Sequence, residues 1–194
     1  PIKKRIFSSG ECCIEILDRV AGEAVFIIQA TGGPVHEHWM ELFIFVDALR
    51  RAGAAQITVV VPYLGYARQD RIIKNKQISI TVNLVMALLE KSGITRLVTM
   101  DLHSEDRLEP VEFPIINLHA GVVLMDALKK NNQWDPLRER VLVSPDSGGV
   151  DRCCYVADAF KTNWVMINKQ ERDAFVGDVQ NKHCIIMDDL IDTG

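Results

Sequence analysis

The 194-residue sequence has no long hydrophobic run, no excess of basic residues and no low-complexity stretch. Apolar runs such as 24–28 and 42–46 are far shorter than the roughly 20 residues that a membrane-spanning helix needs. The 22 basic and 26 acidic residues give a net charge of −4, which excludes a general attraction to nucleic acid or anionic membranes. A hydrophobic content of 48% excludes intrinsic disorder. We therefore expect a soluble globular protein with neither kind of partner.

Cysteine is scarce and has no spacing typical of a disulfide framework or a zinc site. The five cysteines form two adjacent pairs, 12–13 and 153–154, and a lone Cys184, without a Cys-x-x-Cys motif. No secretory or transit segment is visible. We expect buried thiols in a reducing compartment, and hence a cytoplasmic protein.

Short β-rich runs alternate along the chain with longer runs of helical period. The expected strands are residues 24–29, 56–62, 96–100, 140–143, 163–168 and 183–187. The expected helices are residues 35–52, 79–92, 121–130 and 148–160. The run 57–61 is continuously apolar, which is typical of a parallel strand covered on both faces. The pattern predicts an α/β fold, with a boundary near 117–121 that separates residues 1–118 from residues 119–194.

The first expected helix carries two further patterns. Trp39, Phe43, Val46 and Leu49 follow helical spacing and are predicted to lie in the core. The sequence 36–38, His-Glu-His, lacks the i,i+4 histidine pair of a zinc-binding helix because position 40 is Met. We interpret it as the polar start of the helix rather than as a metal site.

Each half of the chain ends in an acidic loop that follows a strand. These loops are residues 101–103 and 188–194, and ligands of open parallel sheets collect beyond the carboxyl ends of strands. In 188–194, two adjacent carboxylates precede a Thr-Gly turn. The turn can cradle a phosphate on its N–H groups while the carboxylates accept hydrogen bonds from ribose hydroxyls. A solvated acidic loop that caps a helix explains the same residues equally well.

Other polar residues near strand ends also have two interpretations. Arg68 can pair with phosphate oxygens, Gln69 can bind a base or phosphate, and Asp70 can hold Arg68 or a cation; a surface ion-pair cluster is the alternative. His103 can bind a divalent cation or donate to a backbone carbonyl. Asp146 lies at a strand end before two glycines, where it can face an anion site or simply cap a helix.

Five segments together resemble the ribose-phosphate diphosphokinase (PRPP synthetase) family, in the family's order and nearly its spacing. They are residues 7–11, 62–71, 99–103, 143–150 and 184–194. The last of them is also similar to the phosphate loop of type I phosphoribosyltransferases. The resemblance implies two similar subdomains of the type I phosphoribosyltransferase kind, each with a mainly parallel sheet flanked by helices. Residues 1–118 would then bind the nucleotide, and residues 119–194 would carry a truncated ribose-phosphate loop.

The resemblance also implies an activity. The family transfers the diphosphoryl group of ATP to the anomeric hydroxyl of ribose 5-phosphate, giving PRPP and AMP, and it uses Mg²⁺. It borrows the loop that matches 7–11 from a neighbouring subunit, which implies a homo-oligomer with shared active sites. Two alternatives stay open: a noncatalytic regulatory subunit descended from the synthetase, and a salvage phosphoribosyltransferase.

Roles in the family pass to matching positions of this sequence. The resemblance implies nucleotide binding by Phe7, Ser9, Glu11, Arg68, Gln69 and Asp70. It implies ribose-phosphate binding by Asp188, Asp189, Asp192, Thr193 and Gly194, magnesium binding by His103 and Asp146, and catalysis by Lys169. Lys74 and Lys76 lie in a polar loop that resembles the family's mobile cationic lid.

Three departures from the family pattern limit this transfer. Ser9 replaces the usual acidic or amide residue, and residues 106–111 do not match the usual continuation after the metal-binding strand. Only residues 170–175 follow Lys169 where the family has a longer loop, so no role passes to Arg172. The chain begins with Pro1 and ends with Gly194 inside the phosphate loop. We expect residues to be missing at both ends and beside Lys169.

Overall fold

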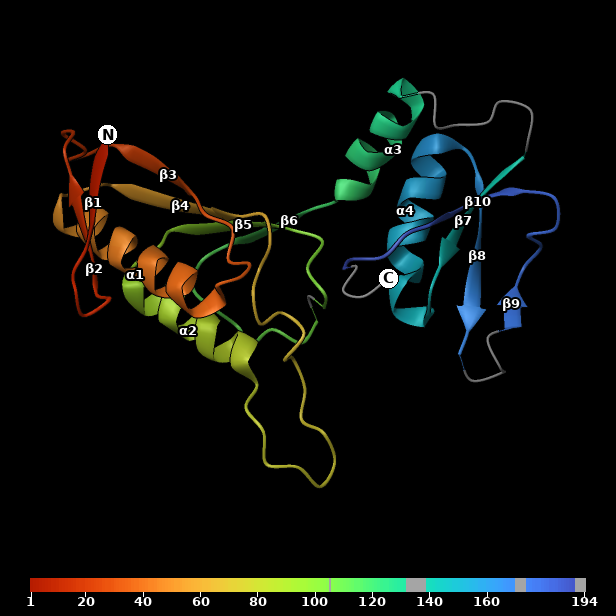
Figure 1. Cartoon of the computed structure of the whole chain (residues 1–194), viewed down its shortest axis with the longest axis horizontal. Coiled ribbons are helices and arrows are strands. Elements are labelled where there is room, and N and C mark those ends of the chain that lie inside the picture. Colours follow the sequence, from red (N-terminus) through yellow and green to blue (C-terminus); the bar gives the residue numbers. More distant parts are fainter. Residues whose placement is uncertain (105, 132–138, 170–173, 191–194) are drawn as a thin grey trace. The chain divides into compact units, whose positions relative to one another are not determined.

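The computed structural model describes residues 1–104, 106–131, 139–169 and 174–190. The chain divides into two compact units, Pro1–Leu118 and His119–Gly194. Figure 1 shows the elements of each unit along the chain. None of the helices within the described residues is long and apolar enough to cross a membrane.

Unit 1 is built on a four-stranded parallel sheet. Its strands are β3 (Ala24–Ile28), β4 (Gln56–Val61), β5 (Arg96–Met100) and β6 (Ile115–Leu118), in the order β3-β4-β5-β6. The structure confirms the strands predicted at 24–29, 56–62 and 96–100, while β6 was not predicted. Residues 57–59 and 61 of β4 are buried, as its continuous apolar run indicated.

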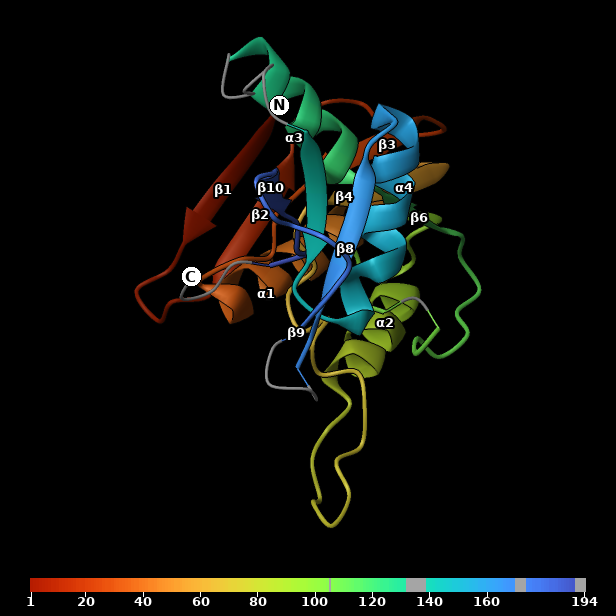
Figure 2. The ribbon, with the colours of Figure 1, turned by 90° about the vertical axis from the view of Figure 1, so that its right-hand side faces the viewer.

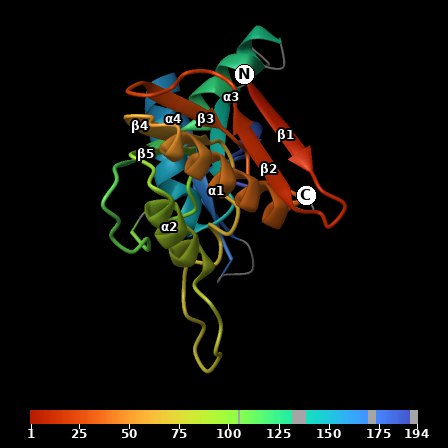
Figure 3. The same cartoon turned by 90° about the vertical axis from the view of Figure 1, so that its left-hand side faces the viewer.

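Helices α1 (Val35–Arg51) and α2 (Thr81–Ser92) pack side by side in unit 1 and share its core with the sheet (Figure 3). Trp39, Val46 and Leu49 are at most 3% exposed, which confirms them as core residues. Phe43 is partly buried and stacks on Trp39, with ring centroids 5.7 Å apart. Helix α2 ends at Gly93, whose φ of +97° suits a residue without a Cβ atom.

An antiparallel hairpin, β1 (Ile2–Ile6) and β2 (Cys12–Ile16), precedes the parallel sheet and was not predicted. All residues of β1 are exposed, so the strand shows no alternation of buried and exposed positions. The hairpin contacts α1 through β2, and Lys4 Nζ donates to Glu41 Oε2 of α1 at 2.8 Å. It therefore forms part of unit 1 (Figure 3).

Unit 2 contains a mixed sheet with helices packed against it (Figure 2). Strands β10 (His183–Ile186), β7 (Arg140–Ser144) and β8 (Asn163–Asn168) are parallel, and β9 (Ala174–Val176) adds an antiparallel edge. Helix α3 is Ala120–Lys130, and a short 3₁₀ turn, η1 (Ser147–Gly149), leads into α4 (Val150–Phe160). A core of fully or nearly fully buried residues lies between helices and sheet: Met125, Leu142, Cys153, Val156, Ala157 and Met187.

All five cysteines are free thiols, but they are not all buried as predicted. Cys153 is buried in α4, and this burial raises the pKa of its thiol. Cys13 and Cys184 are exposed. Each lies on a strand, where successive side chains point to opposite faces, so an apolar run alone does not decide burial.

Candidate active site

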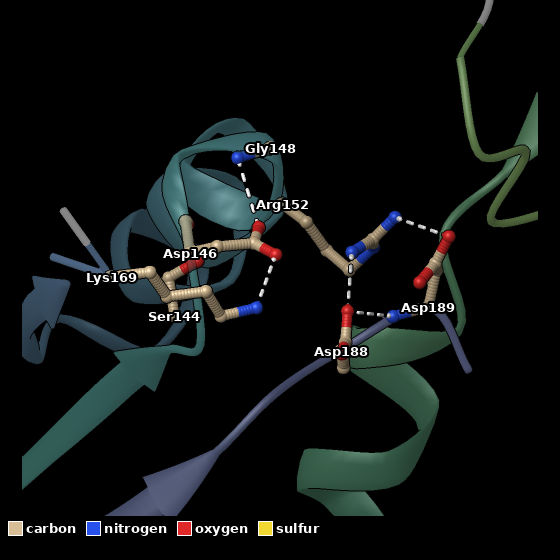
Figure 4. A network of polar contacts seen from close by, with 7 residues as sticks. All are labelled: Ser144, Asp146, Gly148, Arg152, Lys169, Asp188 and Asp189. Atoms are coloured by element: carbon tan, nitrogen blue, oxygen red, sulfur yellow. Dashed lines mark hydrogen bonds and ion pairs between the residues drawn. The ribbon is translucent and has the colours of Figure 1, made fainter. Parts of the chain in front are cut away.

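An ion pair joins the carboxyl ends of two neighbouring strands in unit 2. Asp146 follows β7 and Lys169 follows β8, and Lys169 Nζ lies 3.0 Å from Asp146 Oδ2 (Figure 4). The other carboxylate oxygen, Oδ1, accepts a hydrogen bond of 3.0 Å from the Gly148 N–H group. Asp146 thus caps η1, one of the two roles left open for it, and also contacts the predicted catalytic lysine.

The turn after β7 holds Asp146 in place. Ser144 is fully buried, and its hydroxyl donates to the Asp146 carbonyl at 2.7 Å. A Cβ atom at position 149 would lie 2.6 Å from Ser144 Oγ, so the close approach of the turn requires Gly149. The conformation of the Asp146 side chain therefore depends on its buried neighbours.

The environment of Asp146 favours its ionised form. The hydrogen bond from Lys169 lowers the pKa of the Asp146 carboxyl, against the opposing effect of partial burial. The backbone N–H groups of Gly148 and Gly149 lower it further. Asp146 is therefore a carboxylate throughout the neutral range.

Two more carboxylates follow the third parallel strand, β10. Asp188 Oδ1 lies 3.9 Å from Arg152 NH1, and Asp189 Oδ2 lies 3.9 Å from Arg152 NH2 (Figure 4). The Asp189 N–H group donates to Asp188 Oδ1 at 2.9 Å. Arg152 belongs to the first turn of α4, and its side chain is 12% exposed. One largely buried guanidinium therefore faces both carboxylates.

Asp188 is shifted in the opposite direction to Asp146. Desolvation raises the pKa of the Asp188 carboxyl above its ordinary value of 3.8, and the nearby Asp189 and Asp146 carboxylates raise it further. The Asp189 N–H group offsets part of this effect. At 3.9 Å the Arg152 contact is longer than a hydrogen bond, and burial outweighs it.

Sequence analysis missed Arg152. The available signal was an arginine in the first turn of a helix that begins just after a strand end. Asp192, Thr193 and Gly194, together with Arg172, lie outside the described residues. The predicted roles of Asp192, Thr193 and Gly194 stay predictions.

In unit 1, the connection from β4 to α2 is held close to the end of β3. The buried Thr31 hydroxyl accepts from the Gly65 N–H group at 2.7 Å and donates to the Tyr63 carbonyl at 2.7 Å. Tyr66 follows with a φ of +73°, and its carbonyl accepts from the Gln69 N–H group at 2.9 Å. These contacts position the segment that contains Arg68 and Gln69.

The three predicted nucleotide-binding residues of this segment have different surroundings. Arg68 is exposed. The side-chain oxygen of Gln69 accepts a short hydrogen bond from the Thr81 hydroxyl. The backbone carbonyl of Gln69 accepts from the Val82 N–H group at 3.3 Å. Asp70 is buried, and its Oδ2 accepts from Arg107 NH1 at 2.8 Å. The sequence left Arg68 or a cation open as the partner of Asp70, and it did not identify Arg107.

The end of β5 presents His103. Asp101 turns the chain with a φ of +46° while its N–H group donates to the Leu118 carbonyl at 2.9 Å. The Leu102 N–H group donates to Asn117 Oδ1 at 3.1 Å. These bonds tie the loop to β6 and leave His103 exposed.

The predicted ATP loop of residues 7–11 is the turn of the hairpin. Ser9 Oγ donates to Glu11 Oε2 at 2.6 Å, and the Arg5 guanidinium lies 5.5 Å from the centroid of the Phe7 ring. Gly10 has a φ of +88°. Phe7, Ser9 and Glu11 are all exposed. They are accessible to a ligand, as the predicted contact requires.

Two histidines at the start of α1 have local partners. His36 Nδ1 is 2.5 Å from the Tyr66 hydroxyl, and His38 Nδ1 is 2.8 Å from the Gly32 carbonyl oxygen. Within the part of the chain that the structure describes, no cluster of three or more His, Cys, Asp or Glu residues is arranged to hold a metal ion.

Comparisons with known proteins agree with this geometry. Residues 1–93 match the family described as the N-terminal domain of ribose phosphate pyrophosphokinase. A ribose-phosphate pyrophosphokinase from Ralstonia nicotianae is 40% identical over 97% of this chain and 60% of its own length. The enzyme of that name from Haemophilus influenzae is 43% identical over 97% of this chain and 61% of its own.

A solved structure extends the match to the fold. The crystal structure of phosphoribosylpyrophosphate synthetase from Mycobacterium smegmatis superposes with a TM-score of 0.87 and 33% identity, over 100% of this chain and 64% of that chain. This match confirms the predicted α/β class. The chain spans about three fifths of the length of these curated relatives. Over nearly its whole length it is similar to ribose-phosphate pyrophosphokinases.

Proposed function

We propose that the whole protein transfers the diphosphoryl group of ATP to ribose 5-phosphate, giving PRPP and AMP. The anomeric oxygen forms a bond to the β-phosphorus and loses its proton. The bond between the β-phosphorus and the oxygen that bridges it to the α-phosphorus breaks, and AMP leaves with the electron pair of that bond. Because the reacting groups are polyanions, catalysis depends on orientation and on cationic groups near the transferring phosphates.

The observation that carries the proposal is the set of charged groups after the parallel strands of unit 2. Asp146, Lys169 and the Asp188–Asp189 pair follow β7, β8 and β10, with Arg152 beside the last pair (Figure 4). Ligands of parallel sheets bind at this end of the strands. The similarity to ribose-phosphate pyrophosphokinases supports the same assignment.

We assign ribose 5-phosphate to unit 2. The Asp188 and Asp189 carboxylates accept hydrogen bonds from the ribose hydroxyls, and Arg152 orients both carboxylates and balances their charge. The family resemblance assigns the 5-phosphate to Asp192, Thr193 and Gly194. Backbone N–H groups in such a turn suit a phosphate.

Lys169 is the proposed catalytic residue. Its side chain is 60% exposed, so the ammonium group can leave Asp146 for the transferring phosphates when substrates bind. There it stabilises the negative charge that grows on the phosphate oxygens.

We assign ATP to unit 1. Arg68 pairs with phosphate oxygens, and Gln69 and Asp70 complete the nucleotide segment. Lys74 and Lys76 lie in an exposed loop between β4 and α2 and supply further positive charge. Phe7, Ser9 and Glu11 bind ATP of a neighbouring subunit in a homo-oligomer.

The residues present fit a magnesium ion that is held mainly by substrate. Mg²⁺ prefers oxygen ligands, keeps several waters and is bound in proteins by one or two side chains plus nucleotide phosphates. The exposed His103 of unit 1 and the ionised Asp146 of unit 2 can each supply one such contact, and no cage of three protein ligands is required. When bound, the ion neutralises charge on the phosphates.

The five free cysteines suit a reducing compartment, so we place the protein in the cytoplasm.

One assay tests the proposed reaction. The full-length protein is incubated with ATP, ribose 5-phosphate and Mg²⁺, and AMP and PRPP are measured together. Equal amounts of both products are expected. No product from an otherwise folded protein would favour a noncatalytic subunit. Consumption of PRPP with a free base, without AMP formation from ATP, would favour a salvage phosphoribosyltransferase.

A further inference from the structure

A buried ion pair lies directly beside the proposed nucleotide segment. The side chain of Asp70 is 2% exposed, and its Oδ2 lies 2.8 Å from Arg107 NH1. Asp70 precedes α2, and Arg107 lies 37 positions further along the chain, between β5 and β6. The contact therefore joins two loops of unit 1.

Both loops are also attached to helix α2. At its start, the Val82 N–H group donates to the Gln69 carbonyl. Along its length, Asn83 Oδ1 accepts from the Glu109 N–H group at 3.2 Å, and Glu90 Oε1 accepts from the Glu112 N–H group. The Arg107–Asp70 contact thus joins two loops that are each hydrogen-bonded to α2.

The segment that carries Arg107 is also anchored by packing. Leu108 and Val111 are partly buried against the main core of unit 1. A side chain that projects from such an anchored segment loses less freedom when it forms an ion pair than one on a free loop. The packed backbone segment therefore holds Arg107 in position to pair with Asp70.

The two partners differ in their access to water. The Asp70 carboxylate is almost fully buried, whereas the Arg107 side chain is 45% exposed. A buried carboxylate without a cation is strongly disfavoured, but a half-exposed guanidinium without a carboxylate is solvated by water. Removal of Arg107 should therefore disturb the segment more than neutralisation of Asp70.

We propose that Arg107 is a positioning residue for nucleotide binding, which acts through Asp70 to hold Arg68 and Gln69 in their binding conformation. This inference rests on the proposed function, because it deepens the ATP site assigned to unit 1. Residues 106–111 depart from the family pattern, and through Arg107 this segment contributes to the nucleotide site.

The test compares four variants of the full-length protein with the unmodified protein: Arg107→Met, Arg107→Lys, Asp70→Asn and the double variant Arg107→Met/Asp70→Asn. Arg51→Met is the matched control, because Arg51 also pairs with an aspartate, Asp47, at 2.6 Å, but on the exposed face of α1. Two readouts are used: amide hydrogen exchange of residues 66–70 and 82 without ligand, and the steady-state constants for each substrate.

Arg107→Met should speed exchange at the Gln69 and Val82 amides and raise the KM for ATP by roughly tenfold, with the KM for ribose 5-phosphate changed less than twofold. Arg107→Lys should recover part of both effects. The double variant should exchange more slowly than Arg107→Met, because the buried charge is gone. Arg51→Met should match the unmodified protein in both readouts.

Two results would overturn the inference. One is unchanged exchange of residues 66–70 in Arg107→Met, and the other is an equal rise in KM for both substrates. If the unmodified protein makes no PRPP, the proposed function fails; ATP binding measured by calorimetry, together with the exchange data, then still decides whether Arg107 holds a nucleotide segment. Unchanged ATP affinity in Arg107→Met would refute that role.

Discussion

Lys169 Nζ lies 3.0 Å from Asp146 Oδ2, so the predicted catalytic lysine and a predicted magnesium ligand contact each other directly. The sequence assigned them separate roles and separated them by 23 positions. Their contact arises because parallel strands β7 and β8 end at the same edge of the sheet. The ion pair holds both side chains at that edge before substrates bind.

Lys169→Ala in the full-length protein should lower kcat by roughly 10²- to 10³-fold, the scale for removal of one preorganised charge-stabilising group. Substrate KM values should change less. Lys130→Ala, in the exposed last turn of α3, is the control and should leave kcat unchanged. The measurement is AMP release under saturating substrates. A kcat for Lys169→Ala within threefold of the unmodified enzyme would remove Lys169 from the catalytic group.

Asp188→Asn should raise the melting temperature at neutral pH while it weakens ribose 5-phosphate binding. The folded-state pKa of Asp188 is raised, so its favourable contribution is complete below its ordinary value of 3.8 and is lost as pH rises through the folded-state pKa. The increase in melting temperature caused by Asp188→Asn should therefore appear as the pH rises above 3.8 and then level off. Differential scanning calorimetry between about pH 3.5 and pH 7 measures it.

Asp178→Asn provides a control of opposite sign. The Gln180 N–H group, followed by Lys182, lowers the pKa of Asp178, so ionised Asp178 stabilises the fold above the ordinary value of 3.8. Its replacement should lower the melting temperature at neutral pH, and the difference should shrink in acid. If both variants shifted in the same direction, the interpretation of Asp188 would be wrong.

His103→Ala should raise the Mg²⁺ concentration needed for half-maximal turnover by about tenfold, because the ion loses one protein ligand. Excess chelator should abolish turnover of the unmodified enzyme. The melting temperature should change little, since the His103 side chain is exposed. An unchanged magnesium titration would make His103 a structural residue.

Glu11→Ala should raise the KM for ATP by roughly three- to tenfold if the hairpin turn contacts nucleotide. Glu15→Ala, on β2 of the same hairpin and also exposed, is the matched control. Light scattering beside the assay tests whether the site is shared between subunits. A fully active dilute monomer would contradict sharing.

Gly65→Ala should destabilise unit 1 by about 1–3 kcal/mol through steric overlap. An added Cβ atom would lie 2.6 Å from the Thr31 carbonyl oxygen and 3.1 Å from Trp39 Nε1. At Gly32, an added Cβ atom would meet only Tyr63 Cδ1, at an ordinary 3.8 Å, so Gly32→Ala is the control. Denaturant unfolding of both variants measures the difference. Equal midpoints would show that the loop relaxes around residue 65.

Local sequence patterns were sufficient for the main elements of the fold. Continuous apolar runs identified strands such as β4, and helical spacing with a terminal glycine identified α2. The same patterns missed β1 and β9, whose residues are exposed throughout. An element that buries no face leaves no periodic hydrophobic signal, even when backbone hydrogen bonds hold it in a sheet.

The residue types of the candidate site were also available from the sequence, because Asp146, Lys169, Asp188 and Asp189 each follow an expected strand. Their partners were not. Asp70 pairs with Arg107 rather than with a neighbour in sequence, and Arg152 faces two carboxylates that lie 36 and 37 positions further along the chain. Only the tertiary structure decided these contacts, because parallel strands and their crossover helices bring distant loops to one edge. Local patterns record propensity and burial, whereas the pairing of charges depends on which loops the completed sheet places together.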